Sequence, residues 1–370
     1  MGFPLSSKKA FQRRFVRPPL ATQRICTYKG PMKQIELTHA FGLSNLLERS
    51  MEKGTLKPDE IRISTAAASL NYRDLLMIEG KYNPRQPLPL VPLSDGVGTI
   101  TEVGSSVTER HVGERVCGLF CQSWDQGDLK KSHLAQTLGG PLPGMWRQEV
   151  ILPANGVIEV PDYLSDEEAA TLPCAALTAW SALMERCQTQ EGQWVVCLGT
   201  GGVSLFAMQI ANALGAHTIV LTSSDEKAKR VKRLGCDETI NYTVDDRWDK
   251  RVREITGGDG ADHVIEVGGA GTFDRSVRSL RPDGHMSLIG VLAAGHKAPN
   301  LTAVLMHQIR VQGIFVGHKQ GFHRMNSFFQ EHQIRPVIDS VHDGFVGHGA
   351  LTKMQQKGHF GKICLSLSER

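Results

Sequence analysis

The spacing of hydrophobic and polar positions changes near Pro161, and this change divides the chain into two kinds of sequence. After Pro161, a capping box at 165–168 opens a region in which short apolar runs alternate with stretches of helical spacing. We expect helices over about 169–187, 203–214, 245–255 and 273–280, and strands over 194–198, 217–221, 263–267, 286–289 and 313–316. Strands that alternate with helices in this way predict an α/β fold with a parallel, doubly wound sheet.

Before Pro161 the sequence consists of short strand-like runs that are broken by turns. Strand patterns occupy 61–64, 97–103 and 115–120, and prolines and glycines cluster at 84–98 and 139–144. These patterns predict a β-rich, barrel-like module with few helices. The last part of the chain returns to mixed, turn-rich sequence, so we expect it to fold back onto this module.

The chain therefore divides into an N-terminal extension and two domains. A length of 370 residues agrees with this division, because one hydrophobic core rarely serves so long a chain. We expect a basic, disordered extension over 1–31, a doubly wound α/β domain over 161–317, and a β-rich domain that combines 32–160 with 318–370.

Composition excludes two broad classes of protein. With 41% hydrophobic and 22% charged residues, the chain has too much apolar surface and too little charge to be disordered as a whole. It contains no stretch of about 18 uninterrupted apolar residues, so no membrane span is predicted. Eight scattered cysteines without C-x-x-C pairs agree with reduced thiols, and we expect a cytoplasmic protein.

The basic charge is concentrated at the N-terminal end. Residues 1–35 hold eight Lys and Arg and no acid, and subtracting these from the chain's 42 leaves 34 basic against 38 acidic residues. The body of the chain therefore offers no general nucleic-acid surface, and no nucleic-acid partner is expected. An Arg-rich, acid-free segment is typical of a mitochondrial presequence, so mitochondrial targeting through 1–31 is the alternative to a cytoplasmic location.

A glycine-rich stretch directly follows the strand predicted at 194–198 and opens a predicted helix. Glycines at the first and third positions let backbone N–H groups approach a pyrophosphate at the helix N-terminus. A tight structural turn is the alternative, but the order strand, loop, helix, strand favours dinucleotide binding. The stretch reads Gly199, Thr200, Gly201, Gly202, Val203 and Ser204, with Ser204 in place of the third glycine of the fingerprint.

The end of the next strand indicates which dinucleotide is bound. An NAD site places a carboxylate there, whereas this chain has Thr222 and Ser223, whose hydroxyls suit a 2′-phosphate, with Lys227 one turn further on. The carboxylates of Asp225 and Glu226, which follow closely, favour NADH instead. They are also the acids expected in a first helical turn, with Ser223 and Glu226 spaced as a capping box. We therefore expect NADPH rather than NADH.

Collinear motifs identify the chain as similar to the medium-chain dehydrogenase/reductase family over about residues 33–366. They are NYRD at 71–74, PLSDGVG at 92–98, GERV at 113–116, LPCAALTAW at 172–180, the glycine loop at 199–204, NY at 241–242 and HFGK at 359–362. The resemblance implies a GroES-like β-rich domain formed from both ends of the chain, a Rossmann domain, and a substrate site between them.

The residues expected to bind zinc depart from the family pattern. Zinc alcohol dehydrogenases of the family hold a catalytic metal with a Cys, a His and a second Cys, and the corresponding positions here are Asn71, Ser94 and Cys174. One thiol with an amide and a hydroxyl does not make a zinc site. Cys117 and Cys121 also lack the partners of a four-cysteine structural lobe. The chain therefore resembles the zinc-independent, quinone-oxidoreductase-like branch, and no metal is predicted.

A site without a metal favours conjugated substrates. Reducing a simple ketone places full negative charge on oxygen, whereas an enone or quinone spreads that charge through conjugation. We expect hydride transfer from NADPH to the β-carbon of an activated alkene or to a quinone, followed by protonation. The catalytic candidates are Asn71 and Tyr72, which would polarise the carbonyl, and Tyr82, which would donate the proton. The alternative role of Asn71 is that of a turn residue, and the alternative role of Tyr72 and Tyr82 is packing.

The resemblance also implies a set of cofactor contacts. They are Thr178 near the nicotinamide, 199–203 at the pyrophosphate, Ser223, Lys227 and Tyr242 at the 2′-phosphate, and Val291 with Val316 on the nicotinamide wall. Lys362, in the closing Gly-Lys strand, either faces the cleft or forms a surface or interdomain pair.

Two other functions remain open at this stage. One is interconversion of an alcohol and a carbonyl without metal, and the other is NADPH binding without catalysis. The expected partner is a small apolar enone, quinone or alcohol. Such a substrate would suit a specialised biosynthetic pathway. We expect the loop at 120–147 to set the substrate specificity. The resemblance further implies a homodimer through the edge of the nucleotide sheet.

Overall fold

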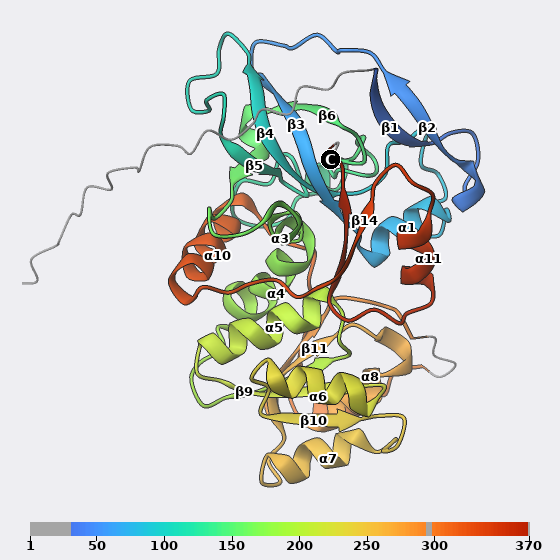
Figure 1. Ribbon diagram of the computed structural model, residues 1–370. Coiled ribbons are helices and arrows are strands. Elements are labelled where there is room, and N and C mark those ends of the chain that lie inside the picture. Colours follow the sequence, from blue (N-terminus) through green and yellow to red (C-terminus); the bar gives the residue numbers. More distant parts are fainter. Residues whose placement is uncertain (1–30, 294–297, 369–370) are drawn as a thin grey trace, which may run out of the picture.

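The computed structural model describes residues 31–293 and 298–368, so the predictions for residues 1–30 lie outside the described part. Two sheets lie at opposite ends of the molecule, with a layer of helices between them (Figure 1). Strands from both ends of the chain share the upper sheet, and the lower sheet comes from the middle of the sequence.

The upper, β-rich domain contains a seven-stranded sheet and a two-stranded hairpin. The hairpin pairs β1 (Met32–Leu37) with β2 (Leu46–Met51). The sheet has the order β14 (Ile338–Asp343), β15 (Lys362–Ser366), β3 (Glu60–Ser69), β4 (Asp95–Val103), β5 (Arg115–Gly118) and β7 (Val157–Glu159), and β6 (Glu149–Pro153) also pairs with β3. Because β15 pairs with β3, the last part of the chain does fold back onto the first module, as predicted.

In the described part of the β-rich domain, the helices that flank its sheet include α1 (Tyr72–Ile78), α2 (Lys131–Leu134) and α11 (Gly349–Gln355). α1 begins where β3 ends, at Asn71, and packs against α11 (Figure 1). The two meet over an apolar cluster that includes Leu75, Ile78, Leu351 and Ile363. This packing fixes the start of α1, where the catalytic candidates lie.

The lower, nucleotide-binding domain is a six-stranded parallel sheet. Its order is β10 (Glu238–Asn241), β9 (His217–Thr222), β8 (Trp194–Leu198), β11 (Ala261–Glu266), β12 (Leu280–Leu288) and β13 (Arg310–Gly313). Numbered along the domain this order is 3-2-1-4-5-6, the arrangement of a dinucleotide-binding doubly wound sheet. The change of direction falls between β8 and β11, at the start of the glycine loop.

Helices cover both faces of this parallel sheet, as its strands require. Val195 and Cys197 of β8 pack in one cluster with α5 (Gly202–Ala213), whereas Val196 and Leu198 pack in another with α7 (Trp248–Ile255) and α8 (Phe273–Ser279). Successive side chains point to opposite faces of a strand, so an apolar run buries both faces. The helices α6 (Asp225–Arg233) and α9 (Leu301–Met306) also belong to the nucleotide-binding domain.

One apolar cluster joins the two domains. It includes Ala67 and Val97 of the β-rich sheet together with Val195 and Phe206 of the nucleotide-binding domain. Between the two sheets lie α3 (Asp166–Ala169), α4 (Leu177–Trp180) and α10 (Lys319–His332) (Figure 1). The apolar core is therefore continuous across the predicted domain boundaries near residues 160 and 318, and these boundaries stay predictions.

Several predicted element limits were wrong. The helix expected over 169–187 is divided into α3, a π-helical turn at Leu172–Ala176, α4 and a second π-helical segment at Ser181–Cys187. Pro173 lacks an N–H group and so interrupts the regular ladder of the first turn. The strand expected over 313–316 ends at Gly313, because Val316 takes a positive φ of 47° and the chain turns there towards α10. No helix within 31–293 and 298–368 has the length and hydropathy needed to cross a membrane.

Candidate active site

The glycine loop leaves an open space at the carboxyl end of β8. Gly199 has a φ of 76°, a conformation that favours glycine, and a Cβ atom built at Gly199 or Gly201 would meet no atom within 4 Å. Gly201 caps the twelve-residue helix α5, whose first turn has N–H groups without intrahelical acceptors. This open cradle at a helix N-terminus fits the pyrophosphate of a dinucleotide.

Ser204 occupies the place of the third glycine of the fingerprint. It is buried, and its Oγ donates a hydrogen bond to the carbonyl oxygen of Leu198 at 2.6 Å. The hydroxyl thus ties α5 to the end of β8.

The loop is also bonded to the β-rich domain. The N–H of Gly361 donates to the carbonyl oxygen of Thr200 at 2.9 Å, and Gly201 and Gly361 form an isolated parallel bridge. A Cβ atom at Gly202 would stand 2.5 Å from Cδ of Lys362, so glycine there leaves room for the lysine stem. The segment that enters β15 therefore links the phosphate loop to Lys362.

The residues predicted to contact the ribose and its 2′-phosphate lie where β9 and β10 end. Ser223 is exposed there, and Tyr242, which follows β10, is 42% exposed. The predicted capping box of Ser223 with Glu226 is wrong, because Ser224 caps α6 and its Oγ accepts from the N–H of Lys227 at 3.3 Å. The shift by one residue leaves the side chain of Ser223 outside the cap of α6.

The charged residues at this end have defined partners. Lys227 Nζ donates to the carbonyl oxygen of His359 at 3.1 Å, and burial lowers the pKa of this lysine. The carboxylate of Asp225 accepts from Nδ2 of Asn241 at 2.7 Å, which directs it to the end of β10. Glu226 is exposed. Lys227 thus stays near Ser223, while its ammonium also contacts the β-rich domain.

Asn71 begins α1 inside a buried polar cluster. Its backbone N–H donates to Oδ2 of Asp74 at 2.8 Å, and Oδ1 of Asp74 accepts from the N–H of Ser94 at 3.3 Å. Asn71 Nδ2 lies 3.4 Å from Ser94 Oγ, and that hydroxyl donates to Oδ1 of Asp95 at 3.1 Å. Asp74 therefore orients the backbone of both Asn71 and Ser94.

The ammonium of Lys362 enters the same cluster from β15. Nζ donates to Oδ1 of Asn71 at 2.6 Å and to the carbonyl oxygen of Leu70 at 2.7 Å, and it lies 3.8 Å from Oδ2 of Asp95. The side chain of Lys362 is 4% exposed. Its charged end thus pairs inside the β-rich domain and does not face an open cleft, while its stem covers Gly202.

Burial controls the protonation of this cluster. Desolvation raises the pKa of Asp74 to about 6, against the opposing charge of Arg73. Desolvation likewise raises the pKa of Asp95, and the charge of Lys362 is the largest opposing influence. Burial also raises the pKa of the Cys174 thiol above its ordinary value. Burial therefore disfavours the thiolate form of Cys174.

These residues do not fit the catalytic zinc that the family resemblance would imply. One thiol with an amide and a hydroxyl is a weak ligand set, and the Lys362 ammonium beside Asn71 opposes a second cation. Within the described ranges, no group of three His, Cys, Asp or Glu side chains is arranged to hold a metal ion. Cys117 and Cys121 each donate to a backbone carbonyl instead.

The two candidate tyrosines lie in different surroundings. Tyr72 is the first residue of α1 and packs against the apolar cluster of the β-rich domain, which is the packing role considered above. Tyr82 is 46% exposed, and the guanidinium of Arg73 lies 5.0 Å from the centre of its ring. Tyr82 therefore presents an exposed ring beside Arg73, whereas Tyr72 is partly buried.

The residues expected near the nicotinamide lie on three different segments. Thr178 is buried on α4, and Val291 and Val316 follow β12 and β13. Val316 is 7% exposed and Val291 is 75% exposed. A Cβ atom at Gly317 would stand 2.4 Å from Oγ of Ser181, so the segment after β13 packs directly on the helical region that carries Thr178.

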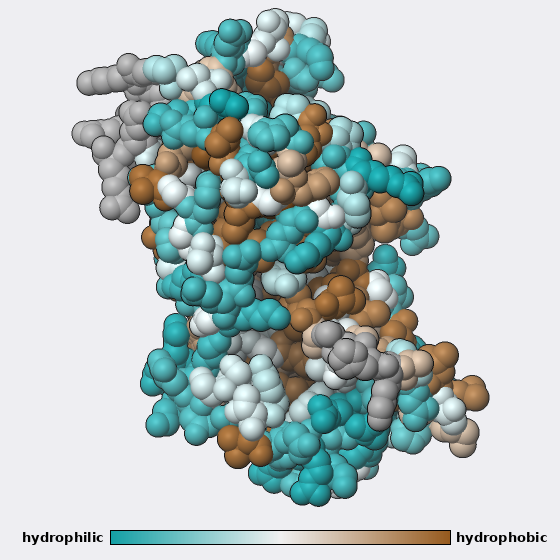
Figure 2. Space-filling model, turned by 90° about the vertical axis from the view of Figure 1, so that its right-hand side faces the viewer, coloured by the Kyte–Doolittle hydropathy of each residue, from teal (hydrophilic) through white to brown (hydrophobic). Residues whose placement is uncertain are grey.

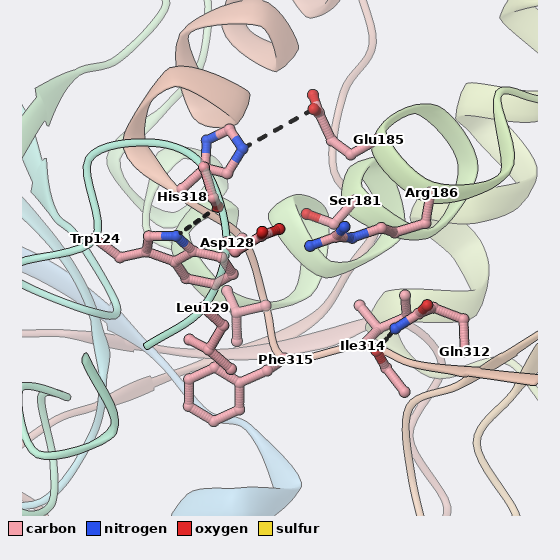
Figure 3. A pocket seen from close by; sticks show the side chains of 14 residues that line it. Trp124, Asp128, Leu129, Ser181, Glu185, Arg186, Gln312, Ile314, Phe315 and His318 are labelled. Carbon is pink, nitrogen blue, oxygen red and sulfur yellow. Dashed lines mark hydrogen bonds and ion pairs between the residues drawn. The ribbon is translucent and has the colours of Figure 1, made fainter. Parts of the chain in front are cut away.

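A cavity of about 260 Å³ lies beside this segment. Trp124, Leu129 and Phe315 line it from one side, and Ser181, Glu185 and Arg186 project from the helical segment on the other side (Figure 3). Apolar side chains also gather in a hollow between the upper and lower halves of the molecule (Figure 2). The predicted specificity loop at 120–147 thus contributes to a partly apolar cavity.

Ring contacts connect this cavity to the start of α1. The ring centres of Phe315 and Phe120 are 5.7 Å apart, and the guanidinium of Arg73 lies 4.9 Å from the centre of Phe120. Arg73 in turn contacts the ring of Tyr82. The cavity, the proton-donor candidate and Asn71 therefore belong to one region of the molecule.

Sequence reasoning missed how the polar cluster is assembled. It named Lys362 and Asn71 separately, on different elements, and gave Asp95 no role. The signal for the pair was weak: Lys362 precedes the apolar run Ile363, Cys364 and Leu365, and so begins a fully buried strand. A lysine at such a position needs an internal partner, because a buried charge without one is costly.

Two family models match the chain. The alcohol dehydrogenase GroES-like domain matches residues 57–162, and the zinc-binding dehydrogenase model matches residues 202–331. A zinc-type alcohol dehydrogenase-like protein from Schizosaccharomyces pombe is 39% identical over 318 residues, which cover 84% of this chain and 92% of that protein. The chain belongs to the medium-chain dehydrogenase/reductase superfamily. The predicted family, the α/β fold and the GroES-like and Rossmann domains are confirmed.

Other members of the superfamily show the range of chemistry around this chain. An acryloyl-coenzyme A reductase from Sulfurisphaera tokodaii is 30% identical over 288 residues, covering 76% of this chain and 84% of that protein. A solved structure of an NAD-dependent alcohol dehydrogenase has a TM-score of 0.83 and 29% identity, and covers 90% of this chain and 99% of its own. The chain is therefore an oxidoreductase that uses a nicotinamide cofactor.

Proposed function

We propose that this medium-chain dehydrogenase/reductase transfers hydride from NADPH to an activated C=C bond of an enone, or to a quinone, without catalytic zinc. The observation that carries the proposal is the cluster of Asn71, Ser94, Asp95 and Lys362, which supplies hydrogen-bond donors and an ammonium where zinc relatives have metal ligands. The acryloyl-coenzyme A reductases among the relatives support it, because their name describes reduction of a conjugated C=C bond.

The residues of this chain divide the work as follows. Bound NADPH supplies a hydride, and the glycine loop with Ser223 and Lys227 holds its phosphates. Asn71 donates a hydrogen bond to the carbonyl oxygen of the substrate and so draws electrons from the C=C bond. Hydride adds at the β-carbon, the electrons of the double bond move towards the α-carbon and oxygen, and Tyr82 delivers a proton that completes the reduction at the α-carbon.

The acceptor distinguishes this proposal from metal-free reduction of simple ketones. We expect steady NADPH oxidation with menadione or 1-octen-3-one and little with cyclohexanone, because only conjugated acceptors spread the developing charge. Metal analysis of the purified protein completes the test. Turnover of cyclohexanone that depends on one bound zinc per chain would disprove the proposal, and tight NADPH binding with no turnover of any acceptor would favour a binding protein.

The alcohol dehydrogenases among the relatives support a second candidate function, interconversion of an alcohol and a carbonyl. The same spectrophotometric assay, run in the direction of alcohol oxidation, tests this second candidate. NADP⁺ reduction with allylic or simple alcohols, at a rate above that of enone reduction, would favour this alternative.

We also propose that NADPH is preferred over NADH, since Ser223 and Lys227 adjoin the ribose end and the carboxylate of Asp225 is held by Asn241. In Lys227→Met, KM for NADPH should rise about tenfold through the lost ion pair, while KM for NADH stays unchanged. Lys229→Met on the same helix, whose lysine is exposed, is the matched control. Equal effects of Lys227→Met on both cofactors would contradict the preference.

The predicted homodimer is a further proposal. β13 lies at the edge of the Rossmann sheet and is exposed along its length, and the nearby α9 exposes Leu301, Leu305 and Met306. An exposed strand edge with apolar neighbours favours pairing with a second copy. Light scattering should give a dimer for the native protein and a monomer for Leu305→Glu combined with Val311→Lys.

A further inference from the structure

The side-chain amide of Asn71 is held at both ends by groups of opposite character. Oδ1 accepts from the ammonium of Lys362 at 2.6 Å, whereas Nδ2 faces Oγ of Ser94 at 3.4 Å. An ammonium has only donors, so it fixes which end of the amide is oxygen and which is nitrogen. Lys362 therefore determines the direction of the Asn71 N–H groups.

The two contacts differ in strength. The contact of Lys362 with Asn71 is short and charge-assisted, and such bonds are about twice as strong as neutral ones. The contact with Ser94 is long, and a hydrogen bond from the Asn71 side chain also partly opposes the effect of burial, which raises the pKa of Asp95. A cation on the oxygen side of an amide draws electrons from its nitrogen and strengthens its N–H groups as donors, both within the cluster and toward a substrate oxygen that displaces one of these contacts.

Placing Lys362 here is costly for the fold. Its side chain is 4% exposed, the next three residues of β15 are buried and apolar, and its stem requires glycine at 202. Burial of an ammonium carries a large desolvation penalty, and an apolar residue would avoid it. The charge of Lys362 also offsets the burial of Asp95, 3.8 Å from Nζ, but the two shortest contacts of Nζ are to Asn71 Oδ1 and Leu70 O, at 2.6 and 2.7 Å.

We propose that Lys362 is a positioning residue that fixes and polarises the Asn71 amide, so that the amide N–H stabilises negative charge on the oxygen of the substrate. The ammonium thereby supplies, through Asn71, positive charge of the kind that a metal ion supplies directly in zinc enzymes. This inference rests on the proposed function, in which Asn71 is the group that contacts the substrate oxygen.

The first test compares kcat with KM for NADPH in Lys362→Met. We expect kcat for enone reduction to fall about 10- to 100-fold, the loss of a hydrogen bond to a charged group, with KM for NADPH nearly unchanged. Lys353→Met is the matched control: that lysine also pairs with an aspartate of the β-rich domain, Asp339 at 2.5 Å, and its kcat should equal that of the native protein.

A charge-neutral variant separates positioning from simple charge balance. Lys362→Met combined with Asp95→Asn removes both charges and leaves no unpaired carboxylate, so it should fold even if the single variant does not. We expect kcat to stay low. Recovery of native kcat would show that Lys362 only balances Asp95, and the proposal would be wrong.

A second cycle tests whether Lys362 acts through Asn71. In an Asn71→Ala background, adding the Lys362 and Asp95 substitutions should change kcat by less than about threefold, because coupled residues are not additive. A full additional loss would overturn the proposal.

A spectroscopic measurement keeps this inference separate from the proposed function. In selectively labelled protein, the side-chain N–H signals of Asn71 should move upfield in the charge-neutral variant, because polarisation by the ammonium is lost. Signals that do not move would disprove polarisation even in an active enzyme. If the signals move but the native protein reduces no conjugated acceptor, the proposed function fails and the positioning contact stands.

Discussion

The guanidinium carbon of Arg230 lies 3.9 Å from the centre of the Phe360 ring, which makes a cation–π contact between the two domains. Arg230 belongs to α6 of the Rossmann domain, and Phe360 lies just before β15 of the GroES-like domain. Lys227 of the same helix donates to the carbonyl oxygen of His359. α6 therefore holds the segment that continues through Gly361 to Lys362.

Loss of this contact should loosen the segment. In Arg230→Leu we expect the free energy of unfolding to fall by about 1 kcal/mol, the size of a partly desolvated cation–π contact. Amide hydrogen exchange over residues 358–362 should become faster. Arg233→Leu, a change at an exposed arginine of the same helix, should leave both measurements unchanged. Unaltered exchange in Arg230→Leu would mean that the hydrogen bond of Gly361 to Thr200 is enough to hold the segment.

Gly201 should be needed for cofactor binding but not for folding. A Cβ atom there meets no protein atom within 4 Å, so Gly201→Ala should fold with an unchanged melting temperature in the absence of cofactor. The methyl group would occupy the space of the pyrophosphate, and we expect Kd for NADPH, measured by fluorescence titration, to rise at least about tenfold. Gly349→Ala, at another position with no nearby atom, is the control. Native affinity in Gly201→Ala would place the pyrophosphate elsewhere.

Two buried histidines should make the Rossmann sheet sensitive to acid. The rings of His263 and His285 lie 5.0 Å apart, and burial lowers the pKa of both below the ordinary 6.5. Below pH 6.5 the unfolded chain binds protons that the folded chain does not, so stability falls as the pH falls, by up to about 1.4 kcal/mol per pH unit for each histidine.

The variant His285→Leu isolates this effect. Asp74 acts in the opposite direction between its ordinary pKa of 3.8 and about 6, because its raised pKa makes the folded state bind the extra proton. Urea titrations of the native protein and the variant at pH 8 and pH 5.5 cancel this common contribution. We expect His285→Leu to be less sensitive to the change in pH by about 1 kcal/mol. Identical pH dependence would show that His285 is protonated in the folded state.

The cavity beside Leu129 should limit the size of the acceptor. Leu129→Trp places an indole ring against Phe315 in this cavity. We expect KM for menadione to rise about tenfold, because a loss of about one or two kcal/mol of contacts changes binding by this factor. KM for a small enone such as methyl vinyl ketone should be unchanged. Leu134→Trp, at an exposed position of α2, is the control. Equal effects on both acceptors would show that substrates do not enter this cavity.

Most of the candidate site was predictable because its signals are local. The glycine loop needs backbone conformations that are encoded within six residues, and Gly199 and Gly201 show them. The capping residue of α6 was missed by one position, because Ser223 and Ser224 are chemically equal and only the end of β9 decides between them. Lys362 of β15 was predicted either to face the cleft or to form a surface or interdomain pair. Its partner Asn71 lies 291 residues away in the sequence, so no local pattern could identify it.

Apolar periodicity, the glycine loop and the loss of two metal-ligand residues are properties of the sequence itself, and they determined the α/β fold, the nicotinamide cofactor and a cluster unsuited to zinc. Tertiary structure alone decided how Asn71, Ser94, Asp95 and Lys362 meet. Asn71 follows β3, the neighbours Ser94 and Asp95 lie at the start of β4, and Lys362 begins β15. Only the pairing of β15 with β3 brings the ammonium to the amide. Sequence spacing encodes contacts within an element, whereas contacts between distant elements follow from how the sheets pack.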